Sequence, residues 1–152
     1  MRVRPVRPDD FEAVREVHQR AVRAEGPRAY DADQVAAWAD WSGVDELDTD
    51  DGHAVLADRD GEPAGFGRLA VDDGEVVAVY VHPDHAGEGV GTALLAHLEG
   101  YARGAGLAEL RLWSSLNAVG FYERAGYERV GRDSHETTGG VDLETVECRK
   151  RL

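Results

Sequence analysis

Residues 75–95 constrain the fold of this chain more than any other part of the sequence. The stretch begins with valines, an alanine and a tyrosine at 76–81, a composition that favours a buried β-strand. Pro83 follows, and it keeps His82 extended because the proline ring clashes with a helical residue before it. The sequence therefore predicts a strand that ends in a loop and does not run directly into a helix.

Alternating glycines at 87, 89 and 91 leave three backbone positions of that loop without a Cβ atom. Apolar residues with helical spacing follow, so we expect a helix from Thr92 onward. Its predicted apolar face consists of Val90, Leu94, Leu98 and Tyr101. The first N–H groups of a helix are unpaired and lie at the positive end of its dipole, and such a site binds anions, phosphates above all. The loop lacks the Gly-Lys-Ser/Thr of a P-loop and the spacing of a dinucleotide-binding loop, which argues against both nucleotide sites.

A second distinctive segment covers residues 114–127 and reads Ser-Ser-Leu-Asn-Ala-Val-Gly-Phe-Tyr-Glu-Arg-Ala-Gly-Tyr. Ala118, Phe121 and Tyr122 are expected on a short helix that Gly126 ends. The sequence of residues 108–113 predicts a strand just before this segment. That strand should run parallel to 76–81, because a helix joins the two in a right-handed crossover.

These two segments resemble motifs A and B of the GCN5-related N-acetyltransferases. Motif A has a loop of the form Gln/Arg-x-x-Gly-x-Gly/Ala, and residues 86–91 read Ala-Gly-Glu-Gly-Val-Gly. Motif B is often Asn-Ala-x-x-Phe-Tyr-Glu-x-x-Gly-Phe/Tyr, which residues 117–127 match. The resemblance implies an α/β (α+β) fold with a single domain over 1–152. It also implies a mixed central sheet of about seven strands, about four helices, and splayed parallel strands four and five.

The resemblance implies an acetyl-CoA site along motif A. Backbone groups of Val79 and Val81 would hold the pantetheine, and an N–H group near Tyr80 or Val81 would face the thioester oxygen. The pyrophosphate would lie against Ala86, Gly87, Glu88, Gly89, Val90, Gly91 and Thr92. Ala86 stands where the family usually has Gln or Arg, so one side-chain contact to phosphate is missing and the backbone donors remain. Asn117 would either bind the cofactor or cap the following helix.

The resemblance also points to residues for the two proton transfers of an acyl transfer. Tyr122 matches the tyrosine that protonates the departing sulfur in many members, and a phenol with a pKa of about 10 is protonated at neutral pH. The alternative is that Tyr122 is a core aromatic only. Glu75, at the start of the central strand, is the first candidate base, acting through water, and His82 is the second. A third reading is that the enzyme takes up the neutral fraction of the amine or uses a water chain.

Aromatic residues are the candidates for the acceptor site. In the family, the segment between the first two strands usually helps to shape that site, and here it carries Tyr30 and Trp38. Trp113 lies on the neighbouring strand. The alternative is that these aromatics fix a short helix to the core. His18 falls on the apolar side of the first predicted helix and is expected to pack there.

Charge limits the partners that this chain can bind. The net charge is −13 at pH 7, which disfavours nucleic acid because its phosphates would meet a repulsive field. Three arginines, Arg103, Arg124 and Arg129, are candidates for the outer cofactor phosphates, or else form surface salt bridges. The 17 basic residues include one lysine, Lys150. Such a halophilic, acidic composition is typical of proteins that work in concentrated salt, and a GC-rich genome is the alternative explanation.

Composition also bounds the compartment and the cofactors. Hydrophobic residues make up 42% of the 152, so one domain with a real core is expected. No apolar run approaches 18 residues and the first residues lack an apolar signal core, so we expect no membrane segment and a cytoplasmic location. The single cysteine, Cys148, excludes an internal disulfide. His82 and His85 lack the further ligands that a zinc site needs, so no metal is expected. The acidic run 43–52 is expected to be a solvated loop.

The function that the resemblance implies is an acetyl-CoA-dependent N-acetyltransferase. A primary amine would attack the thioester directly in a ternary complex, and it would belong to a small molecule or a peptide. A homodimer is compatible with the sequence. The alternative is a non-catalytic acyl-CoA-binding sensor or regulatory module, which would keep the cofactor site and need no acceptor site.

Overall fold

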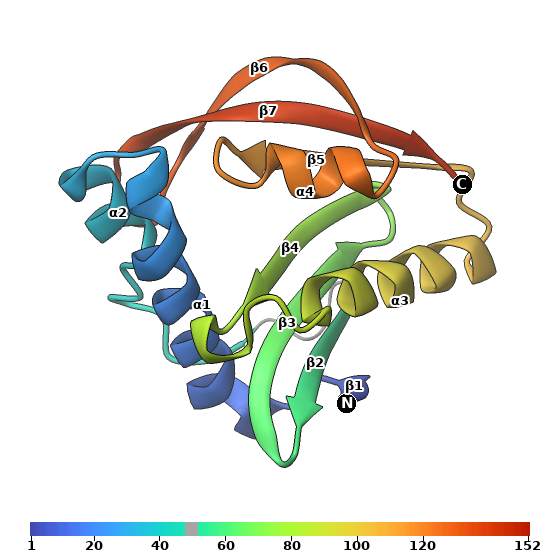
Figure 1. The fold of residues 1–152 in the computed structure, drawn as a ribbon, viewed down its shortest axis with the longest axis horizontal. Helices are drawn as coiled ribbons and strands as arrows, with labels where there is room; N and C mark the ends of the chain where they lie inside the picture. Colours follow the sequence, from blue (N-terminus) through green and yellow to red (C-terminus); the bar gives the residue numbers. More distant parts are fainter. Residues whose placement is uncertain (48–51) are drawn as a thin grey trace.

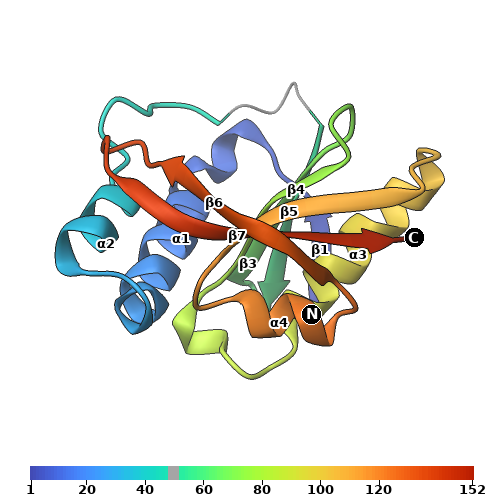
Figure 2. The same ribbon diagram turned by 90° about the horizontal axis from the view of Figure 1, so that it is seen from above.

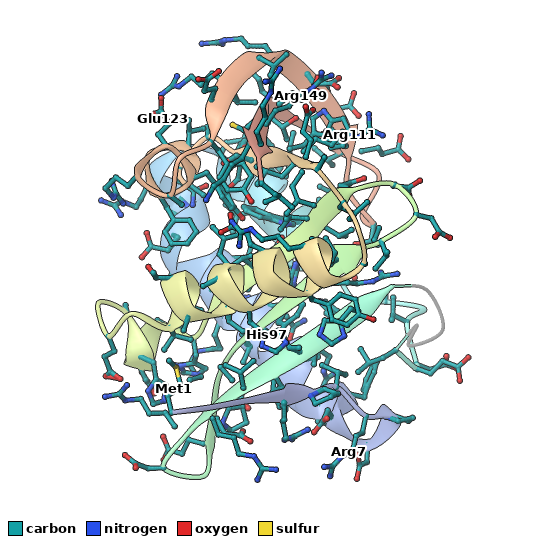
Figure 3. The ribbon with its side chains drawn as sticks, turned by 90° about the vertical axis from the view of Figure 1, so that its right-hand side faces the viewer. Met1, Arg7, His97, Arg111, Glu123 and Arg149 are labelled. Atoms are coloured by element: carbon teal, nitrogen blue, oxygen red, sulfur yellow. The ribbon has the colours of Figure 1, made fainter. Side chains whose placement is uncertain are left out.

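A seven-stranded mixed sheet runs through the computed structural model, which describes residues 1–47 and 52–152 (Figure 1). The strands lie in the order β1-β2-β3-β4-β5-β7-β6. Their bounds are Arg2–Pro5 (β1), His53–Arg59 (β2), Glu62–Ala70 (β3), Glu75–Val81 (β4), Glu109–Ser115 (β5), Glu128–Glu136 (β6) and Asp142–Arg151 (β7). β4 and β5 are parallel, and every other neighbouring pair is antiparallel. In Figure 3, Met1 and Arg7 lie near the β1 edge and Arg149 lies toward the opposite edge.

Helices lie against both faces of this sheet (Figures 1 and 2). The α-helices in the described residues are Phe11–Glu25 (α1), Ala32–Trp38 (α2), Val90–Gly104 (α3) and Val119–Arg124 (α4). Short 3₁₀ turns cover Pro8–Asp10, Gly26–Arg28 and Pro83–His85. The expected mixed sheet with about four helices is therefore confirmed.

Two successive residues of β2 show how the sheet is covered. Val55 and Leu56 point to opposite faces, as neighbours in a strand do, and both are buried. Leu94 and Leu98 of α3 pack in the core cluster that contains Val55. Val14 of α1 packs in the cluster that contains Leu56. The sheet is thus a middle layer, with α1 on one side and α3 on the other.

β4 and β5 separate after a single residue pair. That pair is Glu75 with Arg111, and beside it the N–H of Arg111 donates to the carbonyl oxygen of Gly74 (3.0 Å). No further ladder pair joins the two strands in the part of the chain that the structure describes. The predicted splay of parallel strands four and five is confirmed. One edge of β4 therefore faces an opening in the middle of the sheet.

The helix after the glycine loop differs from the sequence prediction in two details. It begins at Val90 and not at Thr92, with Gly89 as its N-cap in the left-handed conformation (φ 81°). Tyr101 was expected on the apolar face, yet it is 44% exposed, and Ala102 is buried in its place. Ala102 follows Leu98 by four residues and so stays on the same helical face. Tyr101 lies at the edge of that face and stacks on His53, with ring centroids 3.8 Å apart.

Two further expectations concern the acidic loop and the membrane. The predicted solvated loop at 43–52 falls partly on residues 48–51, which lie outside the described residues. Among the helices of the described chain, none has the length and apolar character needed to cross a membrane.

Candidate active site

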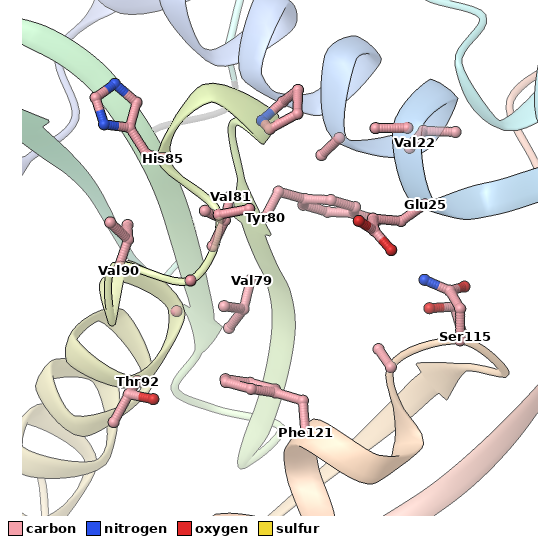
Figure 4. Close-up of a pocket in the computed structure, with 18 of the residues that line it drawn as sticks. Val22, Glu25, Val79, Tyr80, Val81, His85, Val90, Thr92, Ser115 and Phe121 are labelled. Atoms are coloured by element: carbon pink, nitrogen blue, oxygen red, sulfur yellow. The ribbon is translucent and has the colours of Figure 1, made fainter. Parts of the chain in front are cut away.

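Two cavities meet at the opening between β4 and β5. The first has a volume of about 460 Å³ and is bordered by β4, the glycine loop, the start of α3 and the end of α1 (Figure 4). The second has a volume of about 290 Å³ and lies between β4, β5 and the β6–β7 hairpin. Both cavities are lined by Trp38, Val79, Tyr80, Ser115 and Ala118. A molecule extended through the first cavity would therefore reach the second at the point where the strands diverge.

The edge of β4 offers backbone groups to the first cavity. The N–H of His82 donates to the carbonyl oxygen of Ala64 on β3 (2.8 Å). In an antiparallel pair, every second residue bonds to the same partner strand, so Tyr80 also faces β3. Val79 and Val81 consequently direct their N–H and C=O groups away from β3, toward the opening. Both residues line the first cavity, where a ligand with amide groups would satisfy these backbone groups.

The glycine loop forms the end of the first cavity. Gly87 and Gly89 have φ angles of 76° and 81°, in the left-handed region that favours glycine. No atom lies within 4 Å of the position that a Cβ would take at either residue. At Gly91, by contrast, a Cβ would lie 3.3 Å from the side chains of Phe121 and Val81, so this glycine permits close packing.

The N-terminus of α3 presents unpaired donors beside this loop. Ala93 is the first residue of the helix whose N–H bonds back to the chain, at the carbonyl oxygen of Gly89 (3.1 Å). No side chain caps the helix in the described structure. Val90, Gly91 and Thr92 line the cavity ahead of that first bond. The arrangement suits an anionic group such as a pyrophosphate.

Glu88 is the one loop residue of the predicted cofactor site that does not line the cavity. Its carboxylate forms ion pairs with Arg59 (3.0 Å) and His85 (3.2 Å). Ala86 does line the cavity, so the position that usually carries Gln or Arg in the family faces the expected phosphates.

Two polar side chains at the far wall of the first cavity are available to a ligand. The side-chain oxygen of Asn117 is buried and has no hydrogen-bond partner in the described residues. Asn117 does not cap α4, because the N-cap is Ala118 and no side chain bonds there. A buried acceptor without a donor is costly, so a donor from a bound molecule would stabilise it. Arg124 lines the same cavity, whereas Arg103 lines neither cavity and Arg129 pairs with Glu123 (3.0 Å).

Tyr122 lies between the core and the second cavity. It is 7% exposed, and its ring contacts Phe121 and Tyr127 with centroid distances of 5.0 and 5.8 Å. The residue also lines the second cavity. Burial raises the pKa of the Tyr122 phenol above its ordinary value, so the group keeps its proton at neutral pH. Its hydroxyl forms no hydrogen bond that involves the described residues.

Of the two candidate bases, Glu75 faces the cavity and His82 does not. Glu75 lines the second cavity, and burial raises the pKa of its carboxyl group, an effect that the nearby Arg111 opposes. His82 is 7% exposed, and its Nδ1 accepts the N–H of Asp84 (3.1 Å), so it caps the turn Pro83–His85. Within the described chain, no three His, Cys, Asp or Glu side chains gather as ligands of a metal ion would.

Of the three predicted acceptor residues, two line the second cavity and one does not. Trp38 and Trp113 line the second cavity. Tyr30 lines neither cavity and is buried, because its hydroxyl satisfies two backbone groups. It donates to the carbonyl oxygen of Glu144 (2.6 Å) and accepts the N–H of Leu116 (2.9 Å). For Tyr30 the structure therefore agrees with the alternative, in which an aromatic side chain fixes this segment to the core.

Sequence reasoning missed the residues by which the β6–β7 hairpin forms a wall of the second cavity. His135, Glu136 and Thr137 line that cavity, and none of the three was among the predicted site residues. The hairpin reaches the cavity because β7 inserts between β5 and β6. No local pattern in the sequence predicts that long-range pairing.

Comparisons with known proteins agree with this architecture. A family model described as acetyltransferase (GNAT) family matches residues 11–127. An uncharacterised N-acetyltransferase of Methanocaldococcus jannaschii is 28% identical over 140 residues, which cover 83% of this chain and 60% of that protein. The alignment thus spans less than two thirds of the archaeal relative. An uncharacterised N-acetyltransferase of Bacillus subtilis is 33% identical over 105 residues, which cover 68% of this chain and 74% of that protein.

Solved structures share the fold over nearly the full chain. A GCN5-related N-acetyltransferase of Rhodopseudomonas palustris superposes with a TM-score of 0.91 at 28% identity, covering 99% of this chain and 95% of that one. PaiA N-acetyltransferase of Thermoplasma acidophilum, solved in complex with coenzyme A, has a TM-score of 0.73 at 20% identity, with 99% and 98% covered. With the family model covering well over half of the sequence, and the splayed sheet beside a glycine loop in place, the chain belongs to the acetyltransferase (GNAT) family.

Proposed function

We propose that this protein transfers an acetyl group from acetyl-CoA to a primary amine, by direct attack of the amine in a ternary complex. The observation that carries the proposal is the meeting of two cavities at the β4–β5 opening. One is bordered by the glycine loop and the helix start, and the other by Tyr122 and Glu75. A reaction between two bound molecules needs such a shared point, because holding the reactants together removes most of the entropic cost of their encounter.

The first cavity fits acetyl-CoA on the chemistry of its own residues. The unpaired edge groups of Val79 and Val81 suit the amides of the pantetheine arm. The open glycine positions and the uncapped start of α3 suit the pyrophosphate. The unpartnered oxygen of Asn117 and the guanidinium of Arg124 add a hydrogen-bond acceptor and a positive charge. The coenzyme A complex of the PaiA enzyme, which shares the fold, supports the same assignment.

Acetyl-CoA supplies the activated acetyl group, and the remaining steps belong to this chain. Glu75 accepts the proton of the incoming ammonium group through water, so that a neutral amine is available to react. The N–H of Val81, which faces the opening, stabilises the negative charge that develops on the acyl oxygen. Tyr122 donates its proton to the departing sulfur, and the raised pKa of the phenol keeps that proton in place until then. Its phenolate regains a proton as the attacking nitrogen loses one to become the amide.

Release of free CoA thiol from acetyl-CoA across a panel of primary amines tests the proposal. We expect thiol release to saturate with amine concentration and to match the amount of N-acetylated product. A sensor or regulatory module would instead bind acetyl-CoA tightly and release no more thiol with amine than without it.

A further inference from the structure

We propose that the acceptor is a small aliphatic amine that carries a second positive charge. This inference rests on the proposed function, because the second cavity can be an acceptor site only if the first holds acetyl-CoA. Three properties of the second cavity carry it: the charge of its lining, the faces of its aromatic residues and its size.

Two carboxylates and one imidazole are the acidic and basic side chains that line the second cavity. Glu75 comes from β4, and His135 and Glu136 come from the end of β6. Among the described residues, no lysine or arginine belongs to the lining. The guanidinium of Arg111 lies over the ring of Trp113, with its central carbon 5.1 Å from the ring centroid. Arg111 also offsets the charge of Glu75. The carboxylate of Glu136, by contrast, forms no ion pair or hydrogen bond with the residues that the structure describes, so its charge is available to a ligand.

The aromatic residues of the cavity offer their faces more than their polar atoms. The indole N–H of Trp38 donates to the hydroxyl of Tyr80 (3.2 Å), and that of Trp113 donates to Asp133 (3.0 Å). With both indole N–H groups engaged, Trp38 and Trp113 offer aromatic ring carbon to the cavity, and the guanidinium of Arg111 already lies over the ring of Trp113. Ring faces attract cations and also pack well against a methylene chain.

The volume of about 290 Å³ favours a small acceptor. It lies at the lower end of the range for ligand pockets, about 300–1,000 Å³. The cavity follows β4 from Glu75 to Tyr80, five steps of about 3.3 Å along the strand, so it is long for its volume. A linear chain with an amine at its far end suits this elongated shape and the carboxylate of Glu136. An acceptor with a carboxylate at its far end would meet the carboxylate of Glu136, and the imidazole of His135 is the one basic side chain in the described lining.

Three acceptors of matched length separate these cases: butylamine, 1,3-diaminopropane and 4-aminobutanoate. They differ only in the far group, which is a methyl, an ammonium or a carboxylate. We expect the kcat/KM of the diamine, corrected for its two amines, to exceed that of butylamine by about fivefold, as for an exposed ion pair. Butylamine should in turn be a better acceptor than 4-aminobutanoate.

Glu136→Gln tests whether the preference comes from this carboxylate. We expect the ratio of diamine to butylamine kcat/KM to fall toward one in this variant. Glu128→Gln is the matched control, because Glu128 is an exposed glutamate on the same strand that lines neither cavity. It should keep the ratio of the parent protein.

The outcomes distinguish the two proposals. The dicationic acceptor is excluded if amines are acetylated but the diamine is not preferred. It is also excluded if Glu136→Gln and Glu128→Gln give the same ratio of diamine to butylamine kcat/KM. In both cases the proposed acetyltransferase activity remains supported. A different result would be that acetyl-CoA binds but no amine, among these three or in the wider panel, is acetylated. In that case the proposed function is wrong, and the inference about the acceptor is wrong as well.

Discussion

Tyr122 combines two properties at the scale of a single residue: its ring is buried, and it borders a cavity. The ring packs on Phe121 and Tyr127, and the residue faces the second cavity. Burial penalises the phenolate, which raises the pKa of the phenol. A phenol with a raised pKa holds its proton at neutral pH. Tyr122 is therefore still protonated when the sulfur leaves, and the developing thiolate is the base that would take the proton.

The variant Tyr122→Phe tests this role. It keeps the aromatic packing and removes the proton donor, so we expect acetyl-CoA affinity to stay the same while kcat falls by about 10²-fold, the lower range for general acid catalysis. Steady-state kinetics together with calorimetric titration of acetyl-CoA would measure both. Unchanged turnover would remove Tyr122 from the mechanism and leave it as a core aromatic.

Glu75 is expected to set the acidic limb of the pH–rate profile. A base works only when deprotonated, so kcat/KM should fall as the pH falls through the pKa of Glu75. That pKa is raised by burial, so the limb should lie above the pH at which an ordinary glutamate titrates. We expect Glu75→Gln to lose this limb and to lower kcat/KM by about 10²-fold at neutral pH.

Asp73→Asn provides the control for the Glu75 prediction. The charge of Asp73 helps to raise the pKa of Glu75, and Asp73 lines neither cavity. Its removal should move the acidic limb to lower pH with little loss of maximal rate. An acidic limb that persists unchanged in Glu75→Gln would show that the base is another group or water.

The sequence predicts some site residues better than others because they belong to local patterns. Gly87 and Gly89 could be found because left-handed backbone positions demand glycine. Tyr122 could be found through the motif around it. Tyr30 was assigned to the acceptor site, yet it bonds to Glu144, 114 positions away. Glu136 was missed for the same reason, since only the pairing of distant strands brings it to the cavity.

At the scale of elements, a cluster of aromatic rings joins α1, α2 and β4 beside the cavities. The ring of His18 lies 4.6 Å from that of Tyr80 and 6.4 Å from that of Trp38, measured between centroids. The indole N–H of Trp41 donates to Nδ1 of His18 (2.9 Å). Burial raises the pKa of Tyr80 to about 12 and lowers that of His18 to about 4. The cluster is therefore uncharged at neutral pH.

This cluster predicts a loss of stability in mild acid. The folded pKa of His18, about 4, lies below its unfolded value of 6.5, so the neutral form is favoured by folding. As the pH falls from about 6.5 to about 4, the unfolded chain gains a proton that the folded chain cannot hold. The free energy of unfolding should drop by about 3 kcal/mol at most from this residue.

Urea unfolding of the parent protein and of His18→Gln at pH 7 and pH 4 measures the contribution of His18. Gln does not titrate in this range and can still accept the hydrogen bond of Trp41. The variant should therefore lose less stability than the parent between the two pH values. The same loss in both proteins would contradict the assignment of a buried, neutral His18.

The order of elements was largely predictable, because hairpin turns and hydrophobic periodicity are local. The turns before β3 and β4 mark an antiparallel run from β2 to β4. Which neighbour β6 takes could not be predicted, since β7 comes later in the chain and inserts between β5 and β6. The splay of β4 from β5 came from the family resemblance, because neither strand carries a break in its pattern.

At the scale of the whole molecule, net charge is the dominant property. A charge of −13 repels itself, and this repulsion opposes the compact state at low ionic strength. The exposed ion pairs, such as Arg28 with Glu25, contribute little against it. At about 1 M salt the screening length falls to about 3 Å, so most of the repulsion disappears.

We therefore expect the melting temperature to rise with potassium chloride. An increase of a few degrees, equivalent to about 1–2 kcal/mol, should appear between low and molar salt at pH 7. The rise should vanish near the pH at which the net charge approaches zero, which provides an internal control. A melting temperature that is independent of salt at pH 7 would contradict this account of the charge.

Binding of acetyl-CoA along the open edge of β4 is the step on which the proposed function depends most. Hydrogen exchange of the backbone amides, followed residue by residue by NMR, tests it directly. On saturation with acetyl-CoA, exchange at Val79 and Val81 should slow by about tenfold or more, because their N–H groups gain partners. Tyr80, whose N–H already faces β3, should gain less protection. If saturating acetyl-CoA leaves exchange at Val79 and Val81 unchanged, the proposed cofactor site is wrong.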